Sequence, residues 1–242
     1  MTFLRKARFA AVPAIVAVLA LTAIITARAA DDLNNLDKVI ARLDASAKTF
    51  TSAQADIVWD NIQTQPVPDK DSQTGTVLFA RGKDGQMQVA VHIKTDNGKP
   101  LQKDLSYTGG IGKMYEPAIK QMQVFKVGDK SGQLETFLTL GFGGSGQDLK
   151  KNWEIASAGT EAVNGVQAAK LQLVPHDPAL AKTTPKVLLW IDLDKGVALK
   201  QQRFDSTGNY VVFIYSNIEL NKKVPSGAFE IKTASGTQIV TH

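Results

Sequence analysis

Two carboxylates are spaced in a way that could support chemistry. Asp192 and Asp194 lie two residues apart in KVLLWIDLDKG (186–196), so on a β-strand both side chains would leave the same face. Paired carboxylates can act as a general acid and base, or bind calcium through their oxygens. The pair runs directly into Lys195-Gly196, a tight hairpin connection. We therefore interpret the two aspartates as turn residues, with acid–base or calcium chemistry as the alternative.

A glycine-rich segment formally matches a nucleotide-binding pattern. Gly141, Gly143 and Gly146 have the spacing G-x-G-x-x-G, which binds a pyrophosphate when it follows a strand and opens a helix. Here the segment follows LETFLTL (134–140), whose apolar spacing is helical, and no βαβ unit surrounds it. We expect a flexible hinge beside a helix at this point.

The histidines and the missing cysteines argue against a metal site or a covalent catalyst. His92, His176 and His242 show no local spacing typical of zinc ligands. The chain has no cysteine to supply a thiolate ligand, a nucleophile or a disulfide. No G-x-S-x-G, H-E-x-x-H or P-loop sequence occurs. The sequence therefore predicts a protein that is not an enzyme and that has no metal site.

The elements that must position these residues are mostly strands. Short runs of alternating apolar and polar residues, bounded by Gly, Pro, Asn or Asp, are typical of antiparallel strands. The expected strands are 53–63, 75–81, 86–94, 104–109, 112–117, 121–127, 152–157, 166–175, 186–194, 197–205 and 209–220, with a short one near 229–231 and a loop at 64–73. A sheet of this length must curl, close or split to protect its edges. We predict a mainly β protein with some α (α+β), a curved, incompletely closed antiparallel barrel of about 10–11 strands.

Helices are expected at two places. Residues 31–50 form an amphipathic helix, with Leu36, Ile40 and Leu43 on its apolar stripe. A helical insertion follows the sixth strand, with Leu134, Phe137 and Leu138 on one face, and a short helix near 147–151. We expect these apolar stripes to face the inside of the curved sheet as a lid.

The large apolar side chains in the strands suggest what lies under that lid. A barrel of this strand number is too wide for its own side chains to fill, and an apolar cavity stays dry and accepts hydrocarbon. The candidates for its wall are Trp59, Phe79, Val89, Phe125, Trp190 and Phe213. The alternative is that these residues form a filled core.

The N-terminal segment has the composition of an export signal. Residues 1–8 carry three basic residues and no acid, residues 9–26 are apolar, and Ala27-Arg28-Ala29 is a small-residue cleavage pattern. We expect residues 1–29 to be a signal peptide, cleaved near Ala29, and residues 30–242 to be a single periplasmic domain. An uncleaved membrane anchor is the alternative. Residues 30–242 carry 24 basic and 23 acidic residues, so no basic face for nucleic acid is indicated.

Four segments carry a resemblance to a known family. They are TFTSAQADIVW (49–59), GTVLFAR (75–81), GKMYEPAIKQM (112–122) and LKQQRFDSTGNYVVFIYSNIELNKKVPSGAFEI (199–231). Over about residues 33–240 the chain resembles the outer-membrane lipoprotein carrier family, the LolA-like and LolB-like periplasmic lipoprotein-sorting proteins. The resemblance implies an incomplete barrel with a helical lid, an apolar cavity for acyl chains of lipoproteins, and no cofactor. It also implies, as partners, acylated lipoproteins or lipid chains, an inner-membrane lipoprotein-releasing transporter and an outer-membrane acceptor. We expect the protein to be a monomer.

One residue role carries over by position from this resemblance. Arg81 ends the glycine-led strand, where the carrier branch has an arginine that hydrogen-bonds the lid and holds it shut. The carrier branch continues with proline, whereas Gly82 follows here. A guanidinium offers five donors in a planar fork, enough to bind several lid carbonyls. We predict Arg81 as the lid latch, and a solvated arginine at a strand end is the alternative.

Three functions are consistent with the sequence. The first is a periplasmic carrier that takes acyl chains of lipoproteins from the inner to the outer membrane. The second is a lipid- or lipoprotein-sensing regulatory module of the same fold, which an uncleaved 9–26 segment would tether to the membrane. The third is an exported enzyme, which would need a polar cluster with perturbed protonation inside a pocket.

Overall fold

The structure is built mainly from β-strands. The computed structural model describes residues 32–126, 137 and 140–242. Its strands are β1 (Ser52–Gln63), β2 (Asp69–Arg81), β3 (Met87–Asp96), β4 (Lys99–Thr108), β5 (Ile111–Glu116), β6 (Gln121–Lys126), β7 (Trp153–Val163), β8 (Val166–Pro175), β9 (Lys186–Asp192), β10 (Val197–Phe204), β11 (Tyr210–Leu220) and β12 (Gln238–Thr241). Its longer helices are α2 (Leu36–Thr49), α4 (Gly146–Asn152) and α5 (Pro178–Thr183), and η1 (Pro117–Ile119) is a single 3-10 turn.

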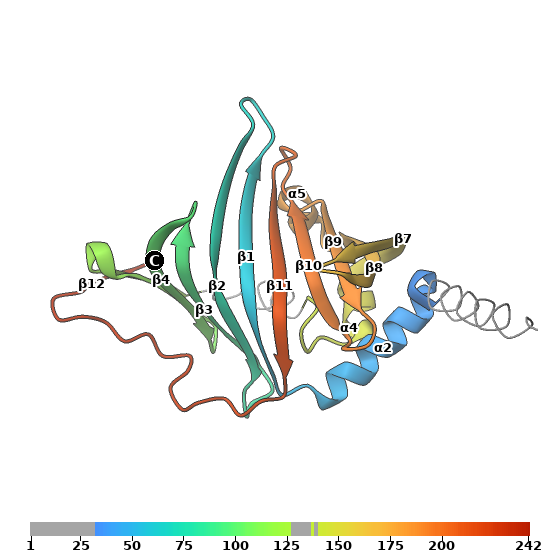
Figure 1. Ribbon diagram of the computed structural model, residues 1–242, viewed down its shortest axis with the longest axis horizontal. Helices are drawn as coiled ribbons and strands as arrows, with labels where there is room; N and C mark the ends of the chain where they lie inside the picture. Colours follow the sequence, from blue (N-terminus) through green and yellow to red (C-terminus); the bar gives the residue numbers. More distant parts are fainter. Residues whose placement is uncertain (1–31, 127–136, 138–139) are drawn as a thin grey trace, which may run out of the picture.

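The strands of the described residues form one curved, open sheet. Their order is β12-β6-β5-β4-β3-β2-β1-β11-β10-β9-β8-β7. Neighbours pair antiparallel, except that β12 is parallel to β6. The two edges, β12 and β7, lie at opposite ends of the molecule, so the sheet does not close (Figure 1). The predicted curved, incompletely closed barrel is confirmed, with twelve described strands in place of 10–11.

Two strand predictions need correction. The expected loop at 64–73 is shorter, because β2 begins at Asp69 and its first five residues pair with the end of β1. These five residues are polar, so their sequence did not predict a strand. The hairpin that they form with β1 extends beyond the neighbouring strands (Figure 1). The strand expected near 229–231 is wrong, since turns bonded from Glu230 N to Gly227 O (2.9 Å) and from Ala228 N to Pro225 O (3.3 Å) occupy this stretch.

The last strand lies further along the chain. After β11, residues 221–237 run past the ends of the central strands to the far edge of the sheet, where β12 joins β6 (Figure 1). Tyr115 holds this segment, because its hydroxyl accepts a hydrogen bond from Ala234 N at 3.1 Å. The C-terminal segment therefore forms a strap along one rim of the sheet.

The N-terminal helix begins later than its periodicity predicts. Asn35 caps α2 by accepting a hydrogen bond from Lys38 N at 3.2 Å, so the expected helix over 31–50 starts at Leu36. The buried face consists of Val39, Ile40 and Leu43. Helix α5 lies in a stretch for which no helix was predicted. Asp177 caps it by accepting a hydrogen bond from Ala179 N at 2.8 Å, and Pro178 lies in its first turn.

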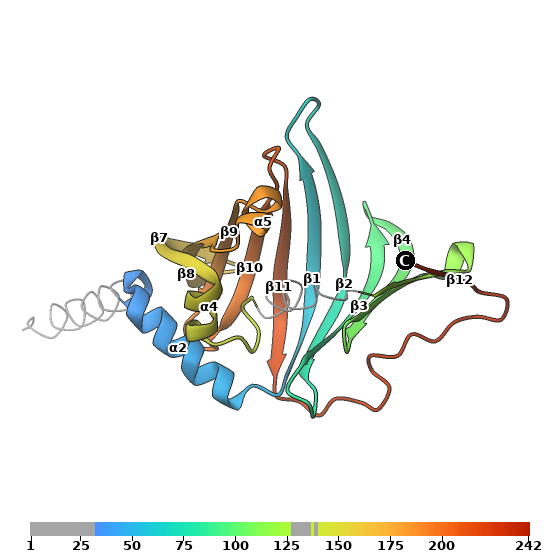
Figure 2. The ribbon, with the colours of Figure 1, turned by 180° about the vertical axis from the view of Figure 1, so that it is seen from behind.

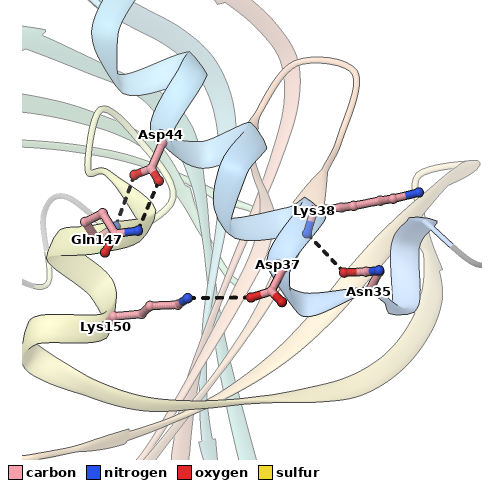
Figure 3. A network of polar contacts seen from close by, with 6 residues as sticks. All are labelled: Asn35, Asp37, Lys38, Asp44, Gln147 and Lys150. Atoms are coloured by element: carbon pink, nitrogen blue, oxygen red, sulfur yellow. Dashed lines mark hydrogen bonds and ion pairs between the residues drawn. The ribbon is translucent and has the colours of Figure 1, made fainter.

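Helices α2 and α4 pack as a pair. The side chain of Asp44 accepts hydrogen bonds from Gln147 N (3.1 Å) and Gln147 Nε2 (3.5 Å), and Lys150 Nζ lies 3.7 Å from Asp37 Oδ1 (Figure 3). Gly146 allows the close approach, because a Cβ there would lie 2.6 Å from Ile40 Cγ2. The two helices and α5 gather beside β7–β10, and η1 alone accompanies β1–β6 among the described residues (Figure 2).

The pair is fastened to the turn between β9 and β10. Arg42 Nε donates to Leu193 O at 2.6 Å, and Arg42 Nη2 donates to Asp194 O. Val39 and Leu43 belong to the same buried core as Leu189 and Ile191 of β9. Among the described residues, α2 and α4 therefore pack on the side of the sheet that contains β9 and β10.

The N-terminal predictions lie outside the described residues. These include the signal segment 1–29 and the apolar stretch 9–26. Within the described residues, no helix combines the length and the hydropathy needed to cross a bilayer.

Candidate functional site

An apolar cavity lies on the inner face of the sheet, where residues of β1–β6 and β9–β11 line it together with Phe137 and Leu140. The strand registers bring Trp59 opposite Phe213 and Ile57 opposite Tyr215, and alternate residues of the neighbouring strands point the same way. The cavity has a volume of about 450 Å³. Its lining residues are Ile57, Trp59, Val77, Phe79, Val89, Val91, Leu105, Ser106, Tyr107, Gly112, Lys113, Met114, Phe125, Phe137, Leu140, Val187, Gln201, Arg203, Phe213 and Tyr215.

Aromatic rings form much of the wall. Phe79 stacks on Phe142 with ring centroids 4.5 Å apart, and Tyr215 meets Phe142 edge-on at 4.9 Å. Trp59 and Phe213 lie 5.3 Å apart on adjacent strands. Burial raises the pKa of Tyr215, so its phenol stays neutral in the physiological range. This part of the cavity offers apolar surface and no charge.

Two polar residues of β10 interrupt the apolar wall. Gln201 Nε2 donates to Leu140 O, which ties the segment before α4 to the sheet. The guanidinium of Arg203 lies over the ring of Phe137, with Cζ 5.3 Å from the ring centroid. Burial lowers the pKa of Arg203, but its guanidinium remains charged at neutral pH.

Arg203 also lines a second, more polar pocket next to the cavity. This pocket has a volume of about 500 Å³. Its lining residues are Asn61, Ile62, Gln63, Asp69, Asp71, Thr183, Thr184, Arg203, Phe204, Asp205, Asn209, Tyr210 and Val211. Arg203 is thus shared between an apolar space and a polar one.

The structure brings together six of the residues predicted from the sequence as cavity or lid residues. These are Trp59, Phe79, Val89, Phe125, Phe137 and Phe213, all of which line the cavity. Phe125 is 38% exposed and stacks on His242, with ring centroids 4.8 Å apart. Two further predicted lid residues, Leu134 and Leu138, lie outside the described residues.

The α2 stripe does not line the cavity. Ile40 and Leu43 are 2% exposed and pack in the core, and Leu36 is partly buried against it. The periodicity identifies the buried face of a helix, but it does not specify which part of the sheet that face meets. The stripe lies over the β8–β10 half, beside the cavity.

Trp190 lies on the wrong face for the predicted wall. It is paired in register with Lys170 and Lys200, and its neighbours Val187 and Leu189 point inward. The two lysine ammonium groups lie 4.9 and 4.1 Å from the Trp190 ring centroid, and both pair with Glu161. Strand alternation places one residue in and the next out, so the choice of Trp190 was off by one position.

Arg81 reaches across to the segment that precedes α4. Its Nη2 donates to Gly143 O at 2.6 Å, and its Nη1 donates to Gly85 O at 3.2 Å. Gly143 has a φ of +73°, and a Cβ there would lie 2.7 Å from Phe50 Cδ1. The contact joins the end of β2 to residues 140–145. Whether it works as a latch stays a prediction.

The glycine-rich segment is packed closely against its surroundings, unlike the flexible hinge expected from its sequence. Leu140, Gly141 and Phe142 are buried, and Ala198 N donates to Gly141 O at 2.9 Å. A Cβ on Gly141 would overlap the Cβ of Ala198. Its glycines serve close packing against β10, Phe50 and α2.

The other candidate groups have structural partners. Asp192 Oδ1 accepts from Asp194 N (2.9 Å) and Lys195 N (3.2 Å), which closes the β9–β10 turn. His92 Nδ1 lies 2.8 Å from Asp104 Oδ1, and His176 Nδ1 lies 3.2 Å from Lys151 O. Across the described ranges, no group of three or more histidine or acidic side chains could hold a metal ion.

Three solved structures show what the chain is similar to. An uncharacterised conserved protein from Thermus thermophilus is 10% identical, with a TM-score of 0.53, and the match covers 85% of this chain and 98% of that chain. The MucA/MucB complex from Pseudomonas aeruginosa matches at 15% identity and a TM-score of 0.47, over 86% of this chain and 64% of that chain. A putative outer membrane lipoprotein-sorting protein domain from Vibrio parahaemolyticus matches at 13% identity and a TM-score of 0.43, over 81% and 97%.

These likenesses concern the fold. The chain spans 64% of the matched chain of the MucA/MucB complex. No protein-family model and no curated protein matches the chain.

Sequence reasoning missed Gln201, Arg203, Leu140 and Tyr215 as lining residues. The strand VALKQQRFD (197–205) gives no clear alternation, because Lys200, Gln201, Gln202 and Arg203 are all polar. The signal that could have found Arg203 is the register, since Arg203 lies opposite Val211, two residues from the inward-facing Phe213.

Proposed function

We propose that the protein binds the acyl chains of lipids or lipoproteins in the cavity and carries them through the periplasm. The observation that carries this proposal is the cavity itself. An apolar space of about 450 Å³ lies on the inner face of an open sheet, where side chains of a filled core would otherwise meet. Ligand sites commonly enclose about 300–1,000 Å³ and are lined mainly by apolar groups.

The energy of filling such a space is large enough for a carrier. Each CH₂ group moved from water to an apolar site contributes about 0.8 kcal/mol. A chain of about 16 carbons would therefore contribute roughly ten kcal/mol before the costs of ordering the ligand and the wall. A guest held by this term alone requires no catalytic group, and most of the wall is apolar.

The wider role is part of the same proposal. A carrier would receive its guest from an inner-membrane transporter and deliver it to an outer-membrane acceptor. An acyl chain would enter at the edge of the sheet where β12 and β6 lie, because Phe125 of β6 lines the cavity and is 38% exposed. Residues 1–29 would direct export, and residues 30–242 would act as one domain.

A cavity-filling substitution tests the proposal. Val91 lines the cavity, and Val91→Trp would place an indole in the space that an acyl chain needs. The matched control is His92→Trp, the next residue on the same strand, whose side chain is 53% exposed on the opposite face. Both variants should keep the β-rich circular dichroism spectrum of the parent.

The measurement is the dissociation constant of a fluorescent 16-carbon acyl probe. We expect Val91→Trp to weaken binding by about tenfold or more, a loss of about 1.4 kcal/mol, and His92→Trp to leave it unchanged. Equal affinity in the parent and in a folded Val91→Trp protein would place the probe elsewhere and remove the cavity from the function.

A further inference from the structure

The cavity contains a cation that no described residue neutralises. Arg203 pairs with Val211 on one side and Val187 on the other, so its side chain leaves the inner face of β10. It is half-buried, and the ring of Phe137 covers one face of the guanidinium. Among the described residues, no hydrogen bond or ion pair reaches its nitrogen atoms.

Four other cations of the described residues have polar partners. Lys170 and Lys200, on the outer face of the same sheet, pair with Glu161. Arg42 and Arg81 donate to backbone carbonyls. A charged group taken out of water without a partner is costly, and the guanidinium cannot escape the cost by losing its proton at neutral pH. The arrangement at Arg203 is therefore the one that a ligand could complete.

The position of Arg203 indicates how a ligand would lie. One side of the residue faces the apolar cavity, and the other faces the polar pocket with Asn61, Thr184 and Asn209. A molecule with a hydrocarbon tail and a polar head fits these two spaces. Its tail would occupy the apolar cavity, and its head would lie in the polar pocket beside Arg203. The cavity wall supplies the apolar contacts, and the guanidinium supplies N–H donors at its end.

The acidic residues of the polar pocket already have partners of their own or face solvent. Asp71 accepts from Asn97 Nδ2 at 2.7 Å and from Asn61 Nδ2 at 3.4 Å. Asp205 accepts from the hydroxyl and the amide of Thr207, at 2.7 and 2.8 Å. Asp69 is exposed at the start of β2. Arg203 is left as the half-buried group with unused donors toward the cavity, whereas Lys113, the other cation of the described lining, is exposed.

We propose that the cavity is selective for acyl chains that end in an anionic group, a carboxylate or a phosphate, and that Arg203 binds this group. The planar fork of a guanidinium matches two oxygens of either group and forms short, charge-assisted hydrogen bonds. This inference rests on the proposed function and narrows its guest to anionic amphiphiles. Asn61 and Asn209 are placed to contact the rest of the head group from the polar pocket.

The test uses probes with matched tails. Oleate is compared with oleyl alcohol, and oleoyl-lysophosphatidate with mono-oleoylglycerol, each by competition against a fluorescent acyl probe bound to the full protein. The two pairs separate a carboxylate guest from a phosphate guest. The variants are Arg203→Gln, which removes the charge, and Arg203→Lys, which keeps the charge without the fork. Lys200→Gln, on the opposite face of the same strand, is the matched control.

We expect at least one anionic probe to bind the parent about tenfold to a hundredfold more tightly than its neutral partner, the range of a hydrogen bond to a charged group. Arg203→Gln should abolish this preference and leave the neutral probes within about twofold, and Arg203→Lys should retain part of it. Lys200→Gln should retain all of it.

Two results would overturn the inference. Anionic and neutral probes could bind the parent equally, which would mean that the chain itself neutralises Arg203. Alternatively, Arg203→Gln could weaken anionic and neutral probes by the same factor, which would make Arg203 a structural residue. If neutral probes still bind tightly in either of these cases, only the inference about Arg203 fails and the proposed function stands. If no probe binds to the parent, the proposed function itself fails.

Discussion

At the residue scale, alternate positions of one strand serve opposite purposes. Val187 of β9 lines the cavity, whereas Trp190, three positions on, is 1% exposed beneath two lysines on the outer face. The sequence identifies both as strand residues. It does not tell which face each takes, because that depends on a register fixed by partners distant in the chain. Trp59, Phe79 and Val89 were assigned to the correct face, and Trp190 was not.

The residues around Trp190 allow a prediction about pH. The hydrogen bond from Lys170 is the main cause that lowers the pKa of Glu161 from its ordinary value of 4.5, and Lys200 adds to it. A carboxylate with a lowered folded-state pKa stabilises the protein fully above its ordinary pKa. That stabilisation is lost as the pH falls through the lowered value.

We therefore expect Glu161→Gln to reduce the free energy of unfolding at neutral pH by about 0.2–1 kcal/mol, since the pair is partly exposed. The difference should disappear in acid, below the lowered pKa. Urea unfolding of both proteins across this range measures it. A deficit that stays constant with pH would show that packing, rather than charge, accounts for the effect.

At the element scale, polar side-chain contacts hold α2, α4 and the segment before α4 in place. Arg42 fastens α2 to the β9–β10 turn, Asp44 and Gln147 join α2 to α4, and Arg81 binds Gly143 O. The periodicity of residues 36–49 predicted the helix and its buried face. The half of the sheet that it covers could not be predicted, because an apolar stripe packs equally well on any apolar surface.

Whether Arg81 holds the segment 140–145 against the sheet can be tested by substitution. Without its guanidinium, Gly143 O loses a charge-assisted donor, so residues 140–145 should open locally more often. We expect Arg81→Leu to speed amide hydrogen exchange in this segment by about threefold to tenfold. Lys83→Leu, in the turn that follows Arg81, is the control and should leave exchange unchanged. Identical exchange in the parent and in Arg81→Leu would end the latch hypothesis.

At the scale of the whole molecule, the open shape of the sheet creates the cavity. The number of strands and their short turns predicted a curved sheet that fails to close. The place of β12 could not be predicted, because this strand is only four residues long, Ile239 within it is 64% exposed, and its parallel partner β6 lies more than a hundred residues earlier. Short exposed strands carry little of the alternation that reveals longer ones.

The central claim is that the space under the open sheet holds hydrocarbon. Native mass spectrometry of the protein purified from its own cell envelope tests this most directly, with the Val91→Trp variant purified in parallel. We predict that the parent retains a bound acyl lipid or acylated peptide, released on activation in the gas phase, and that the variant retains much less. A parent that is free of ligand, and that stays so after incubation with acylated probes, would contradict the account.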